Sequence, residues 1–270
     1  MNRIRFYVNG QKPQAAPTRD ALGAKAVRLG LSVVEDDSAE AIVVLGGDGT
    51  ILRAVHEFPD VPVLGLNLGG LGYLSSVEER DFPNALAMLA KGKYRISERT
   101  MLAVRKVGGG EWATALNDIV MDRVMSGHTA ILDLEVDGRL ATRYLADGLI
   151  IATPTGSTAY SLAAGGPVLM PDSGGFVVTP MSPHALGVRP LVVKDSARFS
   201  VTSRRRANGE AERIGVYADG ANVFMLEADE SMEVVRAAHC AQLIELDGYD
   251  PYGVLARKLG WSGTNAGYAK

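Results

Sequence analysis

The segment Gly46-Gly47-Asp48-Gly49-Thr50 places one carboxylate inside a glycine-rich turn. An apolar run precedes it and helical periodicity follows it, so the sequence predicts a turn from a buried strand into a helix. A backbone without Cβ atoms can approach a phosphate closely, and a helix start offers free N–H donors. Asp48 would repel phosphate unless it accepts a proton from a hydroxyl nucleophile or holds a metal ion. The segment therefore indicates phosphoryl transfer, with an exposed turn as the alternative.

A second glycine-rich loop runs from Leu66 to Tyr73 and also follows a buried-type strand, residues 61–66. The carboxyl ends of parallel strands meet at one edge of a sheet, where ligands bind. We therefore expect this loop and the first one to line one crevice, with Tyr73 able to stack on a ring. Taken alone, the loop is equally compatible with a structural turn.

A third segment, residues 147–160, is dense in threonine, serine and glycine. Its apolar strand, residues 149–152, ends in the run Thr153-Pro154-Thr155-Gly156-Ser157-Thr158. The helix expected at 158–165 has a face of small residues, against which a flat ligand can lie. Its hydroxyls and Tyr160 can hydrogen-bond to a base or a ribose. A purely structural turn does not need this density of polar groups, so the segment favours ligand binding.

Asn117 and Asp118 interrupt an apolar stretch that continues on both sides. Two adjacent polar residues inside a strand must be hydrogen-bonded, so they either serve a ligand or mark a strand edge or bulge. Other catalytic patterns are missing from the sequence. The four histidines show no metal-site spacing, and no G-x-S-x-G elbow occurs.

Two halves of the chain differ in the elements that must hold these residues. In the first half strands alternate with helices, which predicts parallel pairing and an α/β layer. We expect strands at residues 4–8, 41–45 and 61–66, and helices from Thr18 to 29, at 51–58 and from Asp81 onward. After about residue 98 strands follow strands. We expect a hairpin of 101–107 with 112–120, a half-buried strand at 132–136, a type I′ turn at Asp137-Gly138, short strands at 199–202, 215–218, 223–226 and 232–235, and a closing helix within 249–261.

Composition limits the class of protein. The chain has 270 residues, of which 47% are hydrophobic and 22% charged, so a disordered or collagen-like chain is excluded. Its net charge of −3 argues against nucleic-acid binding through bulk positive charge. The run Arg204-Arg205-Arg206 is expected to be a solvated loop, with phosphate or partner contact as the alternative. One cysteine and no apolar run of roughly 18–20 residues predict a cytoplasmic protein.

In their order along the chain, these motifs resemble the NAD kinase family, which phosphorylates the 2′-hydroxyl of the adenosine ribose of NAD to make NADP. The resemblance covers roughly residues 40 to 261. It rests on Gly46 to Thr50; Asn67 with Gly69, Leu71, Gly72 and Tyr73; Asn117-Asp118; Asp147-Gly148 with Thr153 to Leu162 and Gly165-Gly166-Pro167; Pro180-Met181 with Pro183-His184; and the closing Lys258-Leu259-Gly260-Trp261.

The resemblance implies a fold in two parts. Residues 1–97 are expected to form an N-terminal parallel-sheet α/β domain, and residues 98–245 a β-rich, β-sandwich-like domain that binds NAD. Residues 246–270 are expected to form a C-terminal helix that returns to the first domain. The active site would lie between the domains. The family further implies ATP or polyphosphate as donor, Mg2+ or another divalent metal, and a homodimer or homotetramer. The charge balance and the hydropathy of the chain predict no nucleic-acid or membrane partner.

The resemblance also assigns roles residue by residue. Asp48 takes the role of the catalytic base, and the donor loop consists of Gly46, Gly47, Gly49 and Thr50. The residues implied to contact NAD are Asp48, Gly49, Arg53, Tyr73, Asn117, Asp118, Asp147, Thr155, Thr158, Ala159, Tyr160, Ser161, Leu162 and Ala163.

Two departures from the family pattern stand out. The family pair is most often Asn-Glu, whereas Asp118 carries a carboxylate one methylene shorter. Leu145 stands where some relatives have arginine, and Arg143 is the candidate replacement for that charge.

Two alternatives remain open from the sequence. A lipid or sugar kinase can share the Gly-Gly-Asp-Gly-Thr string, although a lipid site needs an apolar groove that residues 147–160 do not offer. A catalytically weak dinucleotide sensor of the same fold would keep the pocket and lose turnover.

Overall fold

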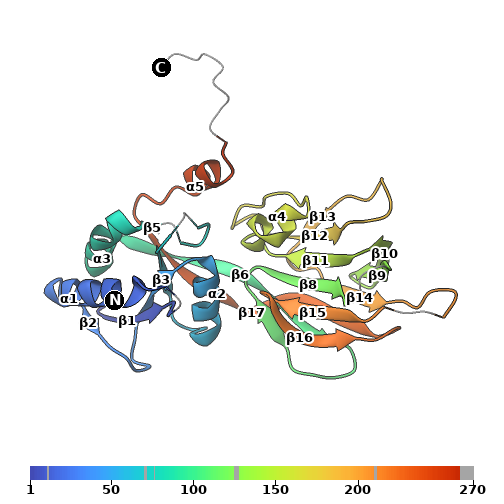
Figure 1. Ribbon diagram of the computed structural model, residues 1–270, viewed down its shortest axis with the longest axis horizontal. Coiled ribbons are helices and arrows are strands. Elements are labelled where there is room, and N and C mark those ends of the chain that lie inside the picture. The colour runs from blue at the N-terminus through green and yellow to red at the C-terminus, as the bar shows by residue number, and fades with distance from the viewer. Residues whose placement is uncertain (11, 70–71, 76, 125–127, 210–211, 262–270) are drawn as a thin grey trace, which may run out of the picture. The chain divides into compact units, whose positions relative to one another are not determined.

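The computed structural model describes residues 1–10, 12–69, 72–75, 77–124, 128–209 and 212–261. The chain divides into two compact units (Figure 1). Unit 1 contains Met1–Glu98 with Ala241–Lys270, and unit 2 contains Arg99–Cys240. Two long strands, β6 (Tyr94–Lys106) and β17 (Ser231–Leu246), each have one part in either unit. Among the described residues, no helix combines the length and apolar character needed to cross a membrane.

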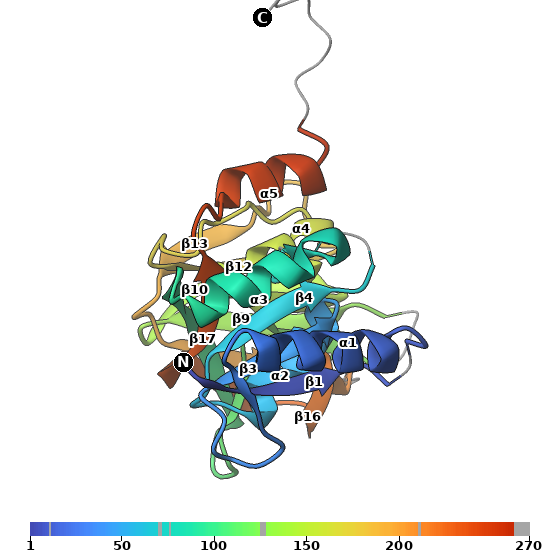
Figure 2. The same cartoon turned by 90° about the vertical axis from the view of Figure 1, so that its left-hand side faces the viewer.

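Unit 1 is an α/β layer, as the alternating pattern predicts. Its parallel strands lie in the order β2-β1-β3-β4, with β5 beside β4. Helices α1 and α3 cover one face of this sheet and α2 the other (Figure 2). The elements are β1 (Arg3–Val8), α1 (Ala15–Arg28), β2 (Ser32–Val33), β3 (Ala41–Gly46), α2 (Asp48–Glu57), β4 (Val63–Asn67), β5 (Val77–Glu78), the 3-10 turn η1 (Glu79–Asp81), α3 (Phe82–Ala90) and α5 (Pro251–Lys258).

The continuous apolar run of β3 is explained by its place in the sheet. Ala41, Val43 and Leu45 pack with Leu22 of α1 and Leu86 of α3 in one core cluster. The intervening residues point to the opposite face, which α2 covers, and every residue of β3 is buried. A parallel strand covered on both sides needs apolar residues at every position, so this prediction is confirmed.

The start of α1 differs from the prediction. The helix begins at Ala15, preceded by Gln14, and Thr18 lies inside its first turns, donating its N–H to the Gln14 carbonyl at 3.1 Å. Pro17 explains the earlier start, because its fixed φ suits the first turn, where its missing N–H has no intrahelical acceptor. The prediction that Thr18 caps this helix is therefore wrong.

Unit 2 is a β-rich unit built from two antiparallel sheets. One has the order β13-β12-β11-β8-β15-β16, and the other contains β10, β9, β14 and the first part of β17. Its elements are β7 (Ala113–Ala115), β8 (Asp118–Arg123), β9 (Ala130–Val136), β10 (Arg139–Ala146), β11 (Gly148–Ala152), the 3-10 turn η2 (Gly156–Thr158), α4 (Tyr160–Ala163), β12 (Gly175–Met181), β13 (Leu191–Lys194), β14 (Phe199–Ser203), β15 (Ile214–Ala218) and β16 (Ala221–Leu226). Strands β12 and β13 were not expected from the sequence.

The two sheets of unit 2 enclose one apolar core. Leu134 of β9 and Phe199 of β14 share a cluster with Met121 of β8 and Ile151 of β11. The other face of the six-stranded sheet carries a smaller cluster with Ile150, which packs near Leu169 after α4. One face of the six-stranded sheet therefore packs in the core between the sheets, and its other face packs against the segment around α4.

Three predicted elements of unit 2 have different limits. The stretch 112–120 is not one strand, because Leu116 and Asn117 separate β7 from β8. Its first part does form the expected hairpin, with Leu102 of β6 opposite Ala115. The helix expected at 158–165 is reduced to α4. The strand expected at 232–235 is instead the 16-residue β17, which pairs with β14 at one end and with β4 at the other.

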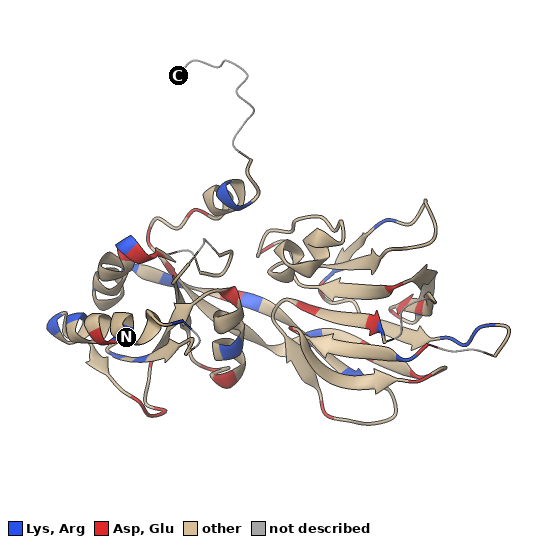
Figure 3. Cartoon of the chain, in the orientation of Figure 1, with Lys and Arg blue, Asp and Glu red and all other residues tan. Residues whose placement is uncertain are grey.

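Charged residues of both signs are interspersed over the elements of each unit (Figure 3).

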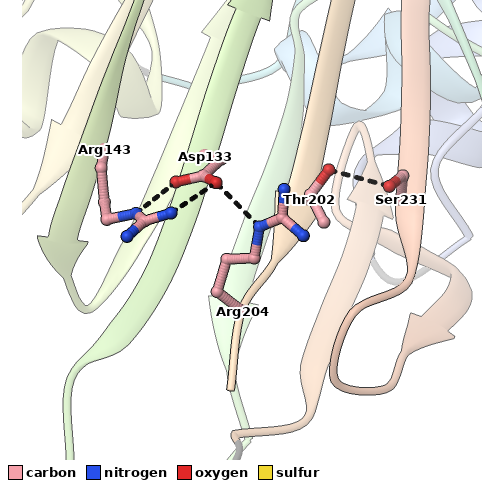
Figure 4. Close-up of polar contacts among 5 residues, drawn as sticks. All are labelled: Asp133, Arg143, Thr202, Arg204 and Ser231. Atoms are coloured by element: carbon pink, nitrogen blue, oxygen red, sulfur yellow. Dashed lines mark hydrogen bonds and ion pairs between the residues drawn. The ribbon is translucent and has the colours of Figure 1, made fainter. Parts of the chain in front are cut away.

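The run Arg204-Arg205-Arg206 is not wholly a solvated loop. Arg204 Nε donates to Asp133 Oδ2 at 2.7 Å, and Arg143 holds the same carboxylate through two bonds of 2.6 and 2.9 Å (Figure 4). Asp133 belongs to the strand predicted to be half-buried, and it is only 3% exposed. Two guanidiniums thus stabilise one carboxylate on the outer face of β9.

Replacing Asp133 by asparagine is expected to remove a pH-dependent part of the stability. Hydrogen bonds from Arg143 and Arg204 lower the pKa of Asp133 to about 2. A lowered folded-state pKa stabilises the protein above the unfolded value of about 4, and this stabilisation disappears as pH falls through about 2. Urea unfolding from pH 5 to 2 should show the wild type losing on the order of 1 kcal/mol more than D133N, after allowance for solvent screening. Parallel curves for the two proteins would contradict this role.

Candidate active site

Asp48 is the first residue of α2, directly after the buried strand β3. Gly47 precedes it in extended conformation as the N-cap residue. A Cβ added to Gly46 would lie 2.4 Å from Thr50 Oγ1, so the tight turn leaves room only for glycine there. A Cβ on Gly47 or Gly49 would instead point into open space. The strand-to-helix turn predicted from the sequence is confirmed, and its open side lies at Gly47 and Gly49.

The carboxylate of Asp48 holds the second glycine-rich loop. Its Oδ2 accepts the Tyr73 N–H at 2.8 Å. Its Oδ1 accepts the N–H groups of Leu74 at 3.2 Å and Ser75 at 3.1 Å, and the Ser75 hydroxyl at 2.9 Å. A Cβ on Gly72 would lie 2.0 Å from Oδ1. The structure therefore brings the first two motifs together at one edge of the sheet, as predicted, while Gly70 and Leu71 lie outside the described residues.

The two oxygens of Asp48 are not equally occupied. A carboxylate offers about four lone-pair directions, two on each oxygen. Among the described residues, three hydrogen bonds fall on Oδ1 and one on Oδ2. The bonds to residues 73–75 fix the orientation of the carboxylate.

Tyr73 and Arg53 are the remaining predicted site residues of unit 1. Burial, followed by the charge of Asp48, raises the pKa of Tyr73. Lys258 of α5 lies 5.4 Å from the centre of the Tyr73 ring, so the closing helix contacts the loop that Asp48 holds. Arg53 is exposed on α2, where its charge acts on Tyr7.

Asp118 is the most perturbed acid among the predicted site residues of unit 2. It begins β8, and only 6% of it is exposed. Burial, with the charge of Asp219 as a second cause, raises the pKa of Asp118 to about 7. Its carboxyl group therefore changes protonation near neutral pH, where it can both accept and donate hydrogen bonds.

The segment around α4 brings Tyr160 toward the same acidic groups. Burial, then the charges of Asp122, Asp118 and Asp147, raise the pKa of Tyr160. Asp118 and Asp122 are four residues apart on β8 and so point to one face of the sheet. Tyr160 is 47% exposed. The third and fourth motifs thus meet in unit 2, and Asp122 joins them although the sequence analysis missed it. The period of two along this strand, which puts residues 118 and 122 on one face, is the signal that could have found it.

Asp147 forms an ion pair that sequence reasoning also missed. Arg123 Nε lies 2.9 Å from Asp147 Oδ1, and the Arg123 N–H donates to the Asp147 carbonyl. The candidate replacement for the missing family arginine is engaged elsewhere, because Arg143 binds Asp133 on β9. Arg123 is therefore the cation beside Asp147, a fact that depends on the antiparallel pairing of β8 with β11.

Most hydroxyls of the third motif serve the fold. Thr153 Oγ1 donates to the Leu116 carbonyl at 2.6 Å, and Ser157 Oγ to the Pro154 carbonyl at 2.6 Å. Ser161 Oγ lies 2.8 Å from Thr179 Oγ1. Thr158 Oγ1 donates to the carbonyl of Thr155, which is itself buried. Ala159 and Leu162 are half-buried, and Ala163 is exposed on the short helix with Tyr160. The density of hydroxyls thus reflects the packing of this turn as well as any ligand.

Within the described ranges, no group of three or more His, Cys, Asp or Glu side chains is placed to hold a metal ion. An Mg2+ ion near Asp48 would have to take most of its ligands from a substrate and from water. That is how Mg2+ is usually held when it accompanies phosphate groups.

Family models and individual relatives match nearly the whole chain. The model of the ATP-NAD kinase N-terminal domain matches residues 6–94, and that of the C-terminal domain matches residues 116–246. The NAD kinase of Symbiobacterium thermophilum is 36% identical, covering 98% of this chain and 100% of that protein. The NAD kinase of Geotalea daltonii is 38% identical, covering 88% of this chain and 85% of that protein.

Two solved structures of NAD or NADH kinases also align with nearly the whole chain. The crystal structure of yeast NADH kinase complexed with NADH aligns with a TM-score of 0.82 at 25% identity, covering 98% of this chain and 89% of that one. The NAD kinase from Archaeoglobus fulgidus in complex with ATP aligns with a TM-score of 0.78 at 25% identity, covering 97% of this chain and 100% of that one.

Proposed function

The chain belongs to the ATP-NAD kinase family, and we propose that it transfers the terminal phosphoryl group of ATP to the 2′-hydroxyl of the adenosine ribose of NAD, giving NADP and ADP. Matches over both halves of the chain favour a dinucleotide kinase over the lipid or sugar kinases that share the first motif. The observation that carries the mechanism is Asp48, a carboxylate at a strand-to-helix glycine turn whose orientation is fixed by hydrogen bonds from residues 73–75.

In the proposed reaction the 2′-hydroxyl oxygen attacks the γ-phosphorus of ATP. The bond between the γ-phosphorus and the oxygen that bridges it to the β-phosphate breaks, and ADP leaves. The hydroxyl proton passes to Oδ2 of Asp48, the oxygen that accepts the Tyr73 N–H. The three bonds on Oδ1 hold the carboxylate in orientation, which limits the reorganisation needed when the proton arrives.

The donor phosphates are proposed to lie against Gly46, Gly47, Gly49 and Thr50. At the start of α2 the N–H groups of Asp48 and Gly49 have no acceptor within the helix, whereas the Thr50 N–H donates to the Gly47 carbonyl at 2.8 Å. The helix dipole favours an anion there. The open space beside Gly47 and Gly49 allows phosphate oxygens to come close to the backbone. Mg2+, bound largely by phosphate oxygens and water, would offset part of the phosphate charge.

Within unit 2 the dinucleotide is proposed to bind through Asn117, Asp118, Asp147 and Tyr160, together with the residues of the α4 segment. Gly49, Arg53 and Tyr73 are proposed as further NAD contacts because the sequence resemblance assigns them that role. When ionised, Asp118 accepts hydrogen bonds from ribose hydroxyls, and Tyr160 lies close enough to share its field. The proposal includes a homodimer or homotetramer, as the sequence resemblance implies, and a cytoplasmic location, as the single cysteine and the lack of a long apolar run predict.

Purified protein with NAD, ATP and Mg2+ is expected to produce NADP. The product is measured with a dehydrogenase that accepts only NADP, and omission of ATP serves as the control. NADH is compared as acceptor, because one solved relative is an NADH kinase. Polyphosphate is compared as donor. If NAD binds by calorimetry and no NADP forms with either donor, the kinase proposal is wrong and the sensor alternative stands.

A further inference from the structure

The turn between β15 and β16 places a carboxylate against the Asn117-Asp118 segment. Asp219 has φ +48° and Gly220 φ +82°, so both take the left-handed conformation of a type I′ turn. Oδ2 of Asp219 accepts the Leu116 N–H at 2.7 Å. Its Oδ1 accepts the N–H groups of Asn117 at 2.7 Å and Asp118 at 3.2 Å. One carboxylate thus binds three consecutive backbone N–H groups.

The carbonyl side of the same segment is also held. Thr153 donates its hydroxyl to the Leu116 carbonyl at 2.6 Å and its N–H to the Asn117 carbonyl at 2.9 Å. The Asp219 N–H donates to the Asp118 carbonyl at 3.1 Å. Leu116 and Asn117 lie in the gap between β7 and β8, where the regular ladder is interrupted. Asp219 and Thr153 replace the missing ladder partners and fix the backbone from which the Asn117 and Asp118 side chains project.

A carboxylate is suited to this place because it offers two acceptor oxygens to three donors. An asparagine keeps one acceptor and turns an NH2 group toward at least one N–H donor, which leaves that donor unpaired. The charge of Asp219 acts on Asp118 as well, since it is the second cause of the raised pKa of Asp118. Asp219 therefore influences both the geometry and the protonation of the neighbouring acid.

We propose that Asp219 is a positioning residue for the dinucleotide: its carboxylate holds residues 116–118 so that Asn117 and Asp118 present their side chains to the adenosine ribose. This inference rests on the proposed function, because it assigns the ribose as the group that those two side chains meet. It concerns a residue to which the sequence analysis gave no role.

The test compares D219N with D137N as a matched control. Asp137 also starts a type I′ turn, with φ +50°, and its Oδ1 accepts one backbone N–H, from Arg198 at 3.0 Å. D219N is expected to raise both the Kd for NAD, measured by calorimetry, and the KM for NAD about ten-fold, with the KM for ATP unchanged. D137N is expected to leave all three values unchanged. D219E, which restores a carboxylate, is expected to recover part of the NAD affinity.

The pH dependence of NAD binding gives a second readout that a merely structural role would not move. Without the Asp219 charge the pKa of Asp118 falls, so the pH dependence of the Kd for NAD should shift to lower pH in D219N. Asp122 on β8, Asp147 before β11 and Tyr160 of α4 also lie in this field and remain unchanged in the variant.

The possible results distinguish a failure of the role proposed for Asp219 from a failure of the proposed kinase activity. An unchanged Kd for NAD in D219N, or equal losses for NAD and ATP with a lowered Tm, overturns the role of Asp219 while NADP formation by the wild type stands. Wild-type protein that binds NAD and makes no NADP contradicts the kinase activity, and the calorimetric comparison still decides the role of Asp219. Wild-type protein that does not bind NAD overturns both.

Discussion

The Asp48→Ala variant is expected to lose about 10²–10⁴-fold in kcat for NADP formation, because the proposed acceptor of the hydroxyl proton is removed. Asp48→Asn should lose a similar factor, since its amide can accept hydrogen bonds and cannot take the proton at neutral pH. The KM values for NAD and ATP should change less than kcat if the role lies in the chemical step. Steady-state kinetics with NADP detection measures all three quantities.

The hydrogen bonds on Asp48 require a control, since both variants also loosen residues 73–75. Ser75→Ala removes the hydroxyl that donates to Oδ1 at 2.9 Å and leaves the carboxylate in place. Its effect on kcat should therefore be several-fold at most. A kcat within about ten-fold of the wild type in both Asp48 variants would show that the carboxylate only orders the loop. A Ser75→Ala variant as slow as Asp48→Ala would lead to the same conclusion.

The Gly156→Ala variant is expected to lose NAD binding at least ten-fold and to lower the stability of the chain by about 1–3 kcal/mol. A Cβ at this position would lie 2.0 Å from the Asn117 carbonyl oxygen, so the backbone of one of the two segments has to move. The displaced turn carries the Thr153 hydroxyl, which donates to the Leu116 carbonyl. The effect therefore reaches the Asn117-Asp118 segment and the start of η2 together.

Gly187→Ala is the matched control for this substitution. A Cβ on Gly187 has no atom within 4 Å, so the change should be close to neutral. Calorimetry of NAD binding and thermal unfolding, run on both variants, measure the two expected losses. A Gly156→Ala protein with wild-type Kd for NAD and wild-type Tm would show that the turn relaxes without disturbing the site.

Local sequence patterns correctly predicted those elements whose conformation is set by residues close to one another in the sequence. The apolar run 41–45 has to be a strand covered on both faces, and the structure buries all of β3. Asp137-Gly138 has to be a tight turn, and both residues take positive φ. The strand-to-helix turn at Asp48 and its meeting with the loop before Ser75 follow from parallel pairing, because consecutive strands of such a sheet end at one edge.

The lengths of some elements depend on partners far away in the chain. The apolar signal at 232–235 marks only the start of β17, whose later residue Leu243 pairs with Val63 of β4. The predicted strand 112–120 ends early because Asp219, about a hundred residues later, takes the N–H groups of Leu116 and Asn117. No period within a window of ten residues contains this information.

The residue types that make up the candidate site were readable in the sequence by itself. A carboxylate among glycines, a polar pair inside an apolar strand and a turn dense in hydroxyls determined where to look and which chemistry to expect. The tertiary structure alone decided what each polar group does. It assigns the Ser161 hydroxyl to Thr179 and the Arg143 guanidinium to Asp133, and it places Arg123 beside Asp147. The physical reason is that a hydrogen bond needs a partner within about 3 Å, and strand pairing, which joins distant segments, decides which partner that is.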